Sequence, residues 1–179
     1  MKSLLFILSL ILFTTNSVYA NDLKIVYIDT DKILNESNAG KDIKKQLDLI
    51  NKKNISKFNQ IEKELVEEDK KISQQKNILS KEELEKKIKE FKKKAIKLNN
   101  DVKNNKNDLI KKNKNATEKI LSSLNSILSD YASKNSIQII LQKRHIAIGR
   151  DDLDITSEIL DTINVKIKNI KLQWLWITL

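Results

Sequence analysis

The chain has 179 residues, with 34 lysines and arginines against 24 aspartates and glutamates, so its formal net charge at pH 7 is +10. It contains no cysteine, no proline and only two glycines. The composition therefore excludes thiol catalysis, cysteine-ligated zinc and disulfide crosslinks. The excess of lysine favours anionic partners such as acidic polypeptides, lipid headgroups or phosphates. Part of that excess is also expected of an AT-rich genome, because lysine, asparagine and isoleucine are abundant together.

Residues 1–20 have the pattern of a secretory signal peptide. A lysine near the start is followed by an apolar run from Leu4 to Phe13 and by the small-x-small cleavage site Val18-Tyr19-Ala20. We expect cleavage between Ala20 and Asn21, and therefore export. The apolar run is too short to span a bilayer as a mature helix, so an uncleaved membrane anchor is the less favoured alternative.

A small β body is predicted to begin in residues 21–40. The segment from Leu23 to Ile28 is dense in β-branched and aromatic residues, which favours a strand. Asp29 offers an N-cap oxygen for a short helix that continues through Leu34. The Asn-Ala-Gly sequence at 38–40 is then expected to end this helix.

Between Gly40 and Gly149 the chain has neither glycine nor proline, so nothing interrupts a helix. Apolar residues recur through much of this stretch at the spacing that forms the seam of a coiled coil. The seam is predicted from Ile43, Leu47, Ile50, Phe58, Ile61, Leu65, Ile72 and Leu79, and then from Leu84, Ile88, Phe91, Ala95, Leu98, Val102, Leu109, Ala116, Ile120, Leu124, Ile127 and Tyr131.

Ser80 and Glu83 have the spacing of a capping box, which predicts that a second helix begins near Lys81. We therefore expect one helix over about 41–75, another over about 81–133, and a tip near 74–80. Two apolar seams joined by a short turn pack as an antiparallel hairpin, so residues 41–133 are predicted to form one long arm. One continuous helix in an intermolecular coiled coil is the alternative.

Strand chemistry returns after the arm, in residues 134–170. Ile137, Ile139 and Leu141 alternate with polar residues, and the run from His145 to Ile148 follows after a short link, which predicts a β-hairpin. The Lys-Arg link is poor chemistry for a two-residue turn. A last helix is predicted to carry an apolar face of Ile155, Ile159, Ile163 and Ile167. The apolar tail at 171–179, which contains both tryptophans, has no assigned role.

The predicted fold class is α+β and predominantly helical, with a long antiparallel coiled-coil hairpin on a small β body. Three short strands leave two open sheet edges, so we expect a closed oligomer in which the sheets complete one another. The predicted oligomer interface consists of apolar strand residues, namely Val26, Ile28, Ile137, Ile139, Leu141, Ile146 and Ile148, with Ile25 and Tyr27 as alternatives to the first two.

These pieces, in this order, resemble the Skp/OmpH family of periplasmic chaperones across the mature chain. The matching segments are 25–29 with 32–34 (first strand and short helix), 37–41 (the break before the first arm), and 136–141 with 154–156 (closing strands and final capped helix). The resemblance implies a homotrimer in which three chains close one β-barrel body, with three helical hairpins around a central cavity. It also implies an ATP-independent holdase in the Gram-negative periplasm that keeps unfolded outer-membrane proteins from aggregating, with no cofactor.

Lysine-rich arms suit a client of this kind. Lysine charges attract acidic chains over a distance that salt shortens, and the aliphatic stems cover apolar client surface. Many weak contacts in one cavity give avidity while each contact stays reversible. We expect a collective contribution from Lys63, Lys71, Lys87, Lys94 and Lys103. An anionic lipid or lipopolysaccharide surface is a further possible partner.

Other function classes find less support in the residues. Asp29 follows a strand as a phosphatase nucleophile does, with Asp151 and Asp152 as a possible metal pair, but the same residues serve as helix caps. His145 is the only histidine, so a serine or cysteine triad would have no plausible base other than this residue. Nucleic-acid binding is disfavoured by the export signal and by few arginines and aromatic residues. A structural coiled-coil spacer remains an alternative. We predict no catalytic, cofactor or metal site.

Overall fold

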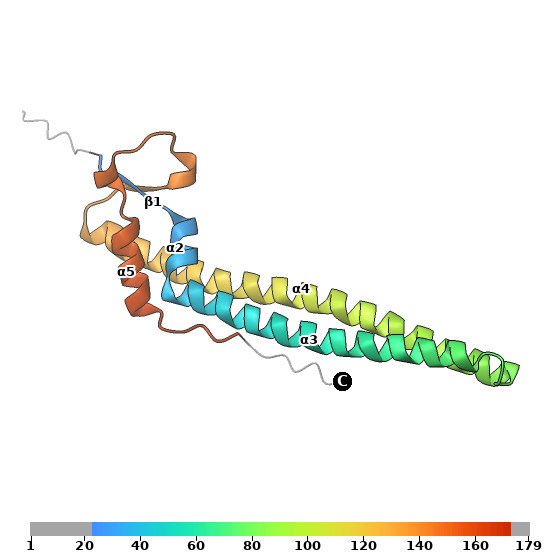
Figure 1. Ribbon diagram of the computed structural model, residues 1–179. Helices are drawn as coiled ribbons and strands as arrows, with labels where there is room; N and C mark the ends of the chain where they lie inside the picture. The colour runs from blue at the N-terminus through green and yellow to red at the C-terminus, as the bar shows by residue number, and fades with distance from the viewer. Residues whose placement is uncertain (1–22, 173–179) are drawn as a thin grey trace, which may run out of the picture.

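The computed structural model describes residues 23–172; the predicted signal peptide, with Ala20 and Asn21, and the end of the apolar tail lie outside this range. Two long helices lie side by side and form a rod, and a small body of short elements sits at one end (Figure 1). In chain order the elements are β1 (Ile25–Ile28), α2 (Thr30–Glu36), α3 (Asn38–Gln75), α4 (Lys81–Lys134), β2 (Ile139–Gln142), the 3-10 turns η1 (Lys143–His145) and η2 (Asp151–Leu153), and α5 (Thr156–Lys166). The predicted predominantly helical α+β fold with a long hairpin is confirmed.

The hairpin turns where the capping box predicted it. The Ser80 side chain accepts from the Glu83 amide at 3.3 Å, and the Glu83 carboxylate accepts from the Ser80 amide at 3.1 Å. These hydrogen bonds satisfy donors that the first turn of α4 leaves free. Helix α4 has 54 residues against 38 in α3, so its last turns continue past α3 and form part of the body.

The break between α2 and α3 lies at Ser37 rather than at residues 38–40. Ser37 is fully buried, and its hydroxyl accepts from the Gly40 amide at 3.1 Å as the N-cap of α3. Gly40 lies in the first turn of α3 and does not end a helix. A Cβ there would stand 1.8 Å from the Leu34 carbonyl oxygen, so glycine is needed for close approach of two backbones.

The sheet of the described residues has two strands, β1 and β2, which pair in parallel with Ile25 opposite Ile139. A parallel pair needs a long crossover, and here the whole helical arm supplies it. On its other side β1 makes a single bridge between Tyr27 and Asp154, where the Ile155 amide donates to the Tyr27 carbonyl at 3.0 Å. The chain after the arm therefore flanks β1 on both sides.

The predicted β-hairpin over 137–148 is wrong. Residues 143–145 form a 3-10 turn, and residues 146–148 are irregular. The loop instead folds over Tyr27, whose hydroxyl donates to the Arg150 carbonyl at 3.1 Å. Gly149 permits this approach, because a Cβ at that position would lie 2.7 Å from the Tyr27 ring. The Lys-Arg link cannot supply the backbone of a tight hairpin turn, and the tyrosine contacts hold the loop elsewhere.

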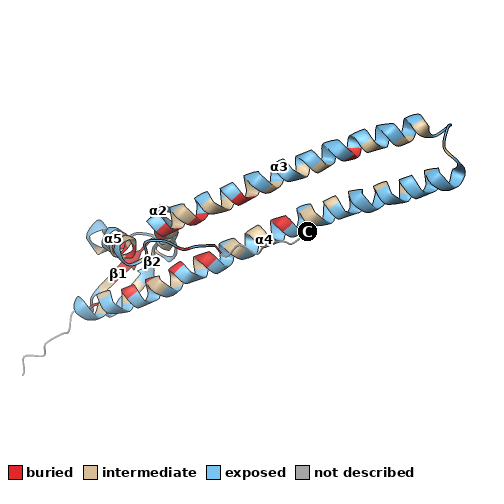
Figure 2. Cartoon of the chain, turned by 90° about the horizontal axis from the view of Figure 1, so that it is seen from below, coloured by how far each residue is buried: buried red, intermediate tan, exposed pale blue. Residues whose placement is uncertain are grey.

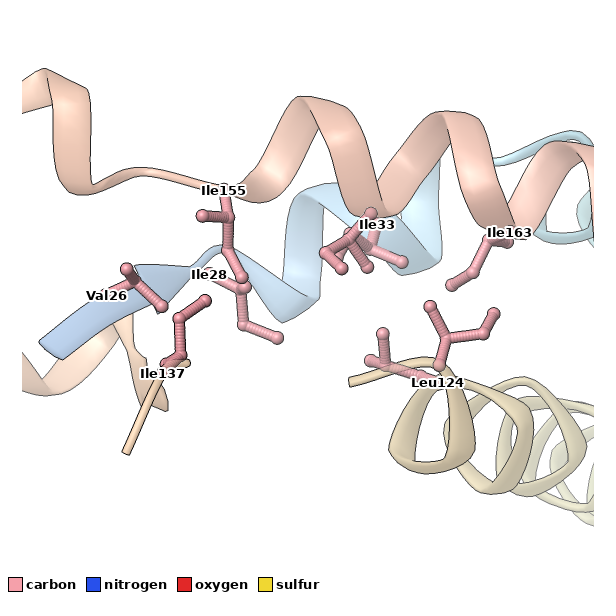
Figure 3. Packing of buried hydrophobic residues seen from close by; sticks show 9 residues of the cluster. Val26, Ile28, Ile33, Leu124, Ile137, Ile155 and Ile163 are labelled. Carbon is pink, nitrogen blue, oxygen red and sulfur yellow. The ribbon is translucent and has the colours of Figure 1, made fainter. Parts of the chain in front are cut away.

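The body is held by an apolar core that draws on nearly all of its elements. Side chains from β1, α2, α4 and α5 point into one space (Figure 3). Ile33, Ile159 and Ile163 are 0% exposed, and Leu124 and Ile127 bring the extended end of α4 against them. Fully burying one such side chain contributes about 1.5–3 kcal/mol to the stability of the fold. Because Leu124 and Ile127 of α4 belong to this core, it fixes the orientation of the arm relative to the body.

The residues predicted for an oligomer interface divide into two groups. Val26, Ile28 and Ile137 belong to the core of the chain itself, so their side chains are already covered. Ile139 and Leu141 point the other way and are exposed, while Ile140 between them packs against the core. Of the later pair, Ile146 is half-buried and Ile148 is 93% exposed. An oligomer interface therefore stays a prediction for the residues outside the core, Ile139, Leu141, Ile146 and Ile148.

Candidate binding surface on the helical arm

The five lysines predicted to contact a partner are all exposed and all lie on the arm, with Lys63 and Lys71 on α3 and the other three on α4. Two of them connect the helices. Lys94 binds the Glu68 carboxylate at 2.9 Å, and Lys87 donates to the Gln75 side chain at 3.0 Å. The hydrogen bond that Lys94 donates to the Glu68 carboxylate raises the pKa of Lys94, against a smaller opposing effect of desolvation.

Lys63, Lys71 and Lys103 make no ion pair with any residue in the range 23–172. Their ammonium groups are therefore available to a partner. The excess of basic residues is concentrated on α4, where lysines recur from Lys86 to Lys119 with few carboxylates between them. Helix α3 differs, because several carboxylates gather between Glu62 and Asp69. The α4 side of the rod thus carries most of the positive field.

Sequence reasoning missed a second component of this surface, the large apolar side chains that lie off the seam. Ile96 and Ile110 on α4 are 61% and 58% exposed. They are spaced by two heptads, and Lys103 lies midway, so the three residues share one face of α4. We call Ile96, Lys103 and Ile110 the α4 stripe. Isoleucines outside the predicted seam were the sequence signal that could have revealed it.

The α4 stripe begins beside a shallow hollow of about 530 Å³, lined by Ile88, Ile96, Glu85 and the lysines at 89, 92 and 93. Exposed apolar residues also occur on α3 at Ile55 and Val66, and at the tip at Ile78. Single exposed apolar residues are ordinary. Repeated ones flanked by lysine stems form a mixed apolar and cationic surface, the kind that suits weak contacts at many points.

The seam itself departs from prediction near its middle. Val102 is 45% exposed, and Asn105 takes the inward position at 8% exposure. The Asn54 amide donates to the Asn105 side-chain oxygen across the two helices. A buried asparagine pair in a coiled-coil seam specifies the register of the helices at some cost in stability. Together with Lys94 and Glu68, this pair aligns α3 against α4.

The residues considered for catalysis are engaged structurally. The Asp29 carboxylate accepts from the Lys32 amide at 2.8 Å as the N-cap of α2, and Asp152 binds Arg150 at 2.7 Å. No group of three metal-ligating side chains occurs within residues 23–172. His145 is exposed at the end of η1. Over the same described part of the chain, no helix is both long and apolar enough to cross a membrane.

A small α+β body that carries one long antiparallel helical hairpin defines a body-and-arm class of protein. The sequence matches the OmpH-like outer membrane protein family over residues 24–163, and the chain belongs to that family. Family membership supports a chaperone role. A comparison with curated proteins gives no match.

A solved structure shares this architecture. It is a candidate outer membrane chaperone (OmpH-like) from Caulobacter crescentus, which matches with a TM-score of 0.78 at 15% sequence identity. The match covers 83% of this chain and 88% of the Caulobacter chain. At this identity the likeness establishes the fold, and the exposed residues of the arm must be argued from this chain alone.

Proposed function

We propose that this protein is an ATP-independent holdase of the periplasm, which binds unfolded outer-membrane proteins between lysine-rich arms and prevents their aggregation. The observation that carries the proposal is the α4 stripe, where two exposed isoleucines flank a lysine without an ion pair among the described residues. Unfolded barrel strands alternate apolar and polar residues, and such segments find both kinds of contact along this face.

The proposed assembly is a homotrimer. In its support, the outer edge of β2 is open within residues 23–172, and the side chains of Ile139 and Leu141 are exposed beside it. The Gln142 side-chain oxygen is buried without a hydrogen-bond partner in the described residues. Open edges with apolar side chains favour pairing with another copy, and closure by symmetry removes them. Three arms around a common axis would then enclose a cavity.

Export rests on the signal-peptide pattern of residues 1–20 and agrees with a chain that has no cysteine to oxidise. The family match is consistent with a periplasmic location. Binding to an anionic lipid or lipopolysaccharide surface remains a prediction from the lysines of α4. Binding to nucleic acid is a competing outcome, which a labelled oligonucleotide under the same salt conditions would reveal.

The test is light scattering of a urea-unfolded outer-membrane barrel diluted with and without the mature protein. We expect suppression of aggregation by the wild type and a clear loss with the double variant Ile96→Ser/Ile110→Ser. Val165→Ser is the matched control, since Val165 is 74% exposed on α5 and lies outside the α4 stripe. Mass measurement should give three chains. Equal suppression by both variants would remove the α4 stripe from the proposal, and no suppression by the wild type would reject the holdase.

A further inference from the structure

The chain after α5 returns to the arm and occupies a groove at its base. It leaves the body beyond Lys166 and runs along the rod in the direction of the tip (Figure 1). Ile170 and Leu172 are 9% and 5% exposed, whereas Lys171 between them is exposed. Alternate burial at this spacing is the pattern of an extended strand, in which every second side chain points the same way.

The groove has an apolar floor made by both arm helices. Ala39 and Ala116 lie where the helices leave the body, and their small side chains leave room for a third segment. The remaining floor residues are Ile43, Ile50 and Ile120. Ile170 and Leu172 complete this cluster, which is separate from the body core. Without an occupant, the part of this cluster that Ile170 and Leu172 cover would face solvent, and an exposed apolar patch is typical of binding sites.

Gln46 recognises the backbone of the occupant. Its side-chain nitrogen donates to the Ile170 carbonyl at 2.9 Å, and its side-chain oxygen accepts from the Leu172 amide at 3.1 Å. The Asp42 carboxylate accepts a further hydrogen bond from the same nitrogen at 2.7 Å, which fixes the orientation of the amide. Gln46 therefore pairs with an extended chain as a neighbouring strand would, and this pairing does not depend on the sequence of the occupant.

The rim of the groove is basic. A hollow of about 450 Å³ adjoins the occupant, and α4 lines it with Lys111, Lys112 and Lys119 together with Asp108 and Glu118. Lys112 is paired with Asp108 at 2.7 Å, and neither Lys111 nor Lys119 forms an ion pair with any residue in the range 23–172. An occupant with acidic residues on its outward face would be attracted to this rim.

We infer that this groove is a receptor for an extended client segment with alternating apolar residues, and that the chain's own segment 169–172 occupies it as an internal competitor. The inference rests on the proposed holdase function and names a site within it. The sequence supports the mimicry, since apolar Ile170 and Leu172 alternate with polar Lys171 and Gln173. Outer-membrane strands carry the same alternation. A client strand would displace the segment and take over its two hydrogen bonds with Gln46.

The experiment uses a fluorescent peptide of about ten residues, the length of a membrane-spanning strand, with alternating apolar and acidic residues. A chain that ends at Lys168 should bind it about tenfold more tightly than the mature wild type, if the segment fills the groove about nine-tenths of the time. Gln46→Leu in the shortened chain should abolish that gain. Gln60→Leu is the matched control, because Gln60 lies exposed on the same helix and bonds only to Glu64 among the described residues.

A crosslink tests the same idea in the full mature chain, where folding is not at risk. Lys119→Cys and Lys171→Cys place thiols on exposed residues that line the same hollow, and the chain has no other cysteine. Joining them with a cleavable bismaleimide should abolish peptide binding, and cleaving the linker should restore it. Unchanged binding after crosslinking, or a shortened chain that folds but gains no affinity, would overturn the inference. The holdase proposal would survive either result if aggregation were still suppressed.

Discussion

Replacement of the asparagine pair in the seam, Asn54 and the buried Asn105, tests how the arm is held in register. In Asn54→Leu, the Asn105 side chain loses its partner while remaining 8% exposed. An unsatisfied buried polar group costs about 1–3 kcal/mol, and a leucine at the half-buried position 54 recovers about 1 kcal/mol at most. We expect this variant to be destabilised by about 1–2 kcal/mol. Adding Asn105→Leu removes the unsatisfied amide and buries a second leucine. The free energy of unfolding of the double variant should therefore exceed that of the wild type by about 2 kcal/mol.

The measurement is urea unfolding followed by helical circular dichroism, at one fixed protein concentration because assembly affects apparent stability. With Asn105→Leu alone as the fourth corner, the double-mutant cycle should give a coupling within the range of about 0.5–3 kcal/mol found for residues in contact. Spin labels on Lys57→Cys and Lys103→Cys should show one distance in the wild type and a broader distribution in the leucine pair, since the register is then less specified. Additive effects, or stabilisation by Asn54→Leu alone, would refute this reasoning.

Three further predictions concern the tip, the body and the length of the arm. Ser80→Ala should cost about 1 kcal/mol of stability, because the Glu83 amide loses its acceptor, and limited proteolysis at the tip should quicken. Burial pushes the pKa of Asp154 up, but hydrogen bonds from Thr156 and Lys143 outweigh it and leave that pKa lowered. The resulting stability is present above about pH 4 and lost as pH falls through the lowered value, and thermal melts of Asp154→Asn should lack this acid dependence. Hydrogen exchange should be fastest near the tip in both arm helices and slowest where α4 meets the body.

The arm could be predicted from sequence because its signals are local. Seam periodicity and the capping box at Ser80 depend on residues that are neighbours on one helix, and both helices follow within a few residues of the expected bounds. The break between α2 and α3 was predicted at residues 38–40 but lies at Ser37. Glycine normally ends a helix, whereas Gly40 lies within α3 and permits close approach to the Leu34 carbonyl. That role depends on two helices meeting at a corner, which periodicity does not encode.

The body and the base of the arm depend on contacts between distant segments, and there sequence reasoning failed in part. Parallel pairing of β1 with β2 joins residues separated by the whole arm. The loop that was expected to form a strand is held over Tyr27 by the Arg150 carbonyl. The backbone of Ile170 and Leu172 is bound by the Gln46 side chain. A single glutamine on α3 is not a sequence signal from which this contact could be predicted.

Packing along the arm is graded, and this gradient bears on how a client is held. The buried residues of α4 lie between Asn105 and Ile127, and none occurs in its first turns near the tip (Figure 2). On α3 the buried seam reaches only as far as Leu65. Segments with few buried contacts open at low free energy, so the distal half of the rod bends and frays more easily than the base. The hollow beside Ile96 lies on this compliant half, whereas the groove around Gln46 lies on the rigid one. If the proposed function holds, a client finds an adaptable surface on the distal half and a defined strand receptor at the base, which combines weak capture at many points with ordered binding at one.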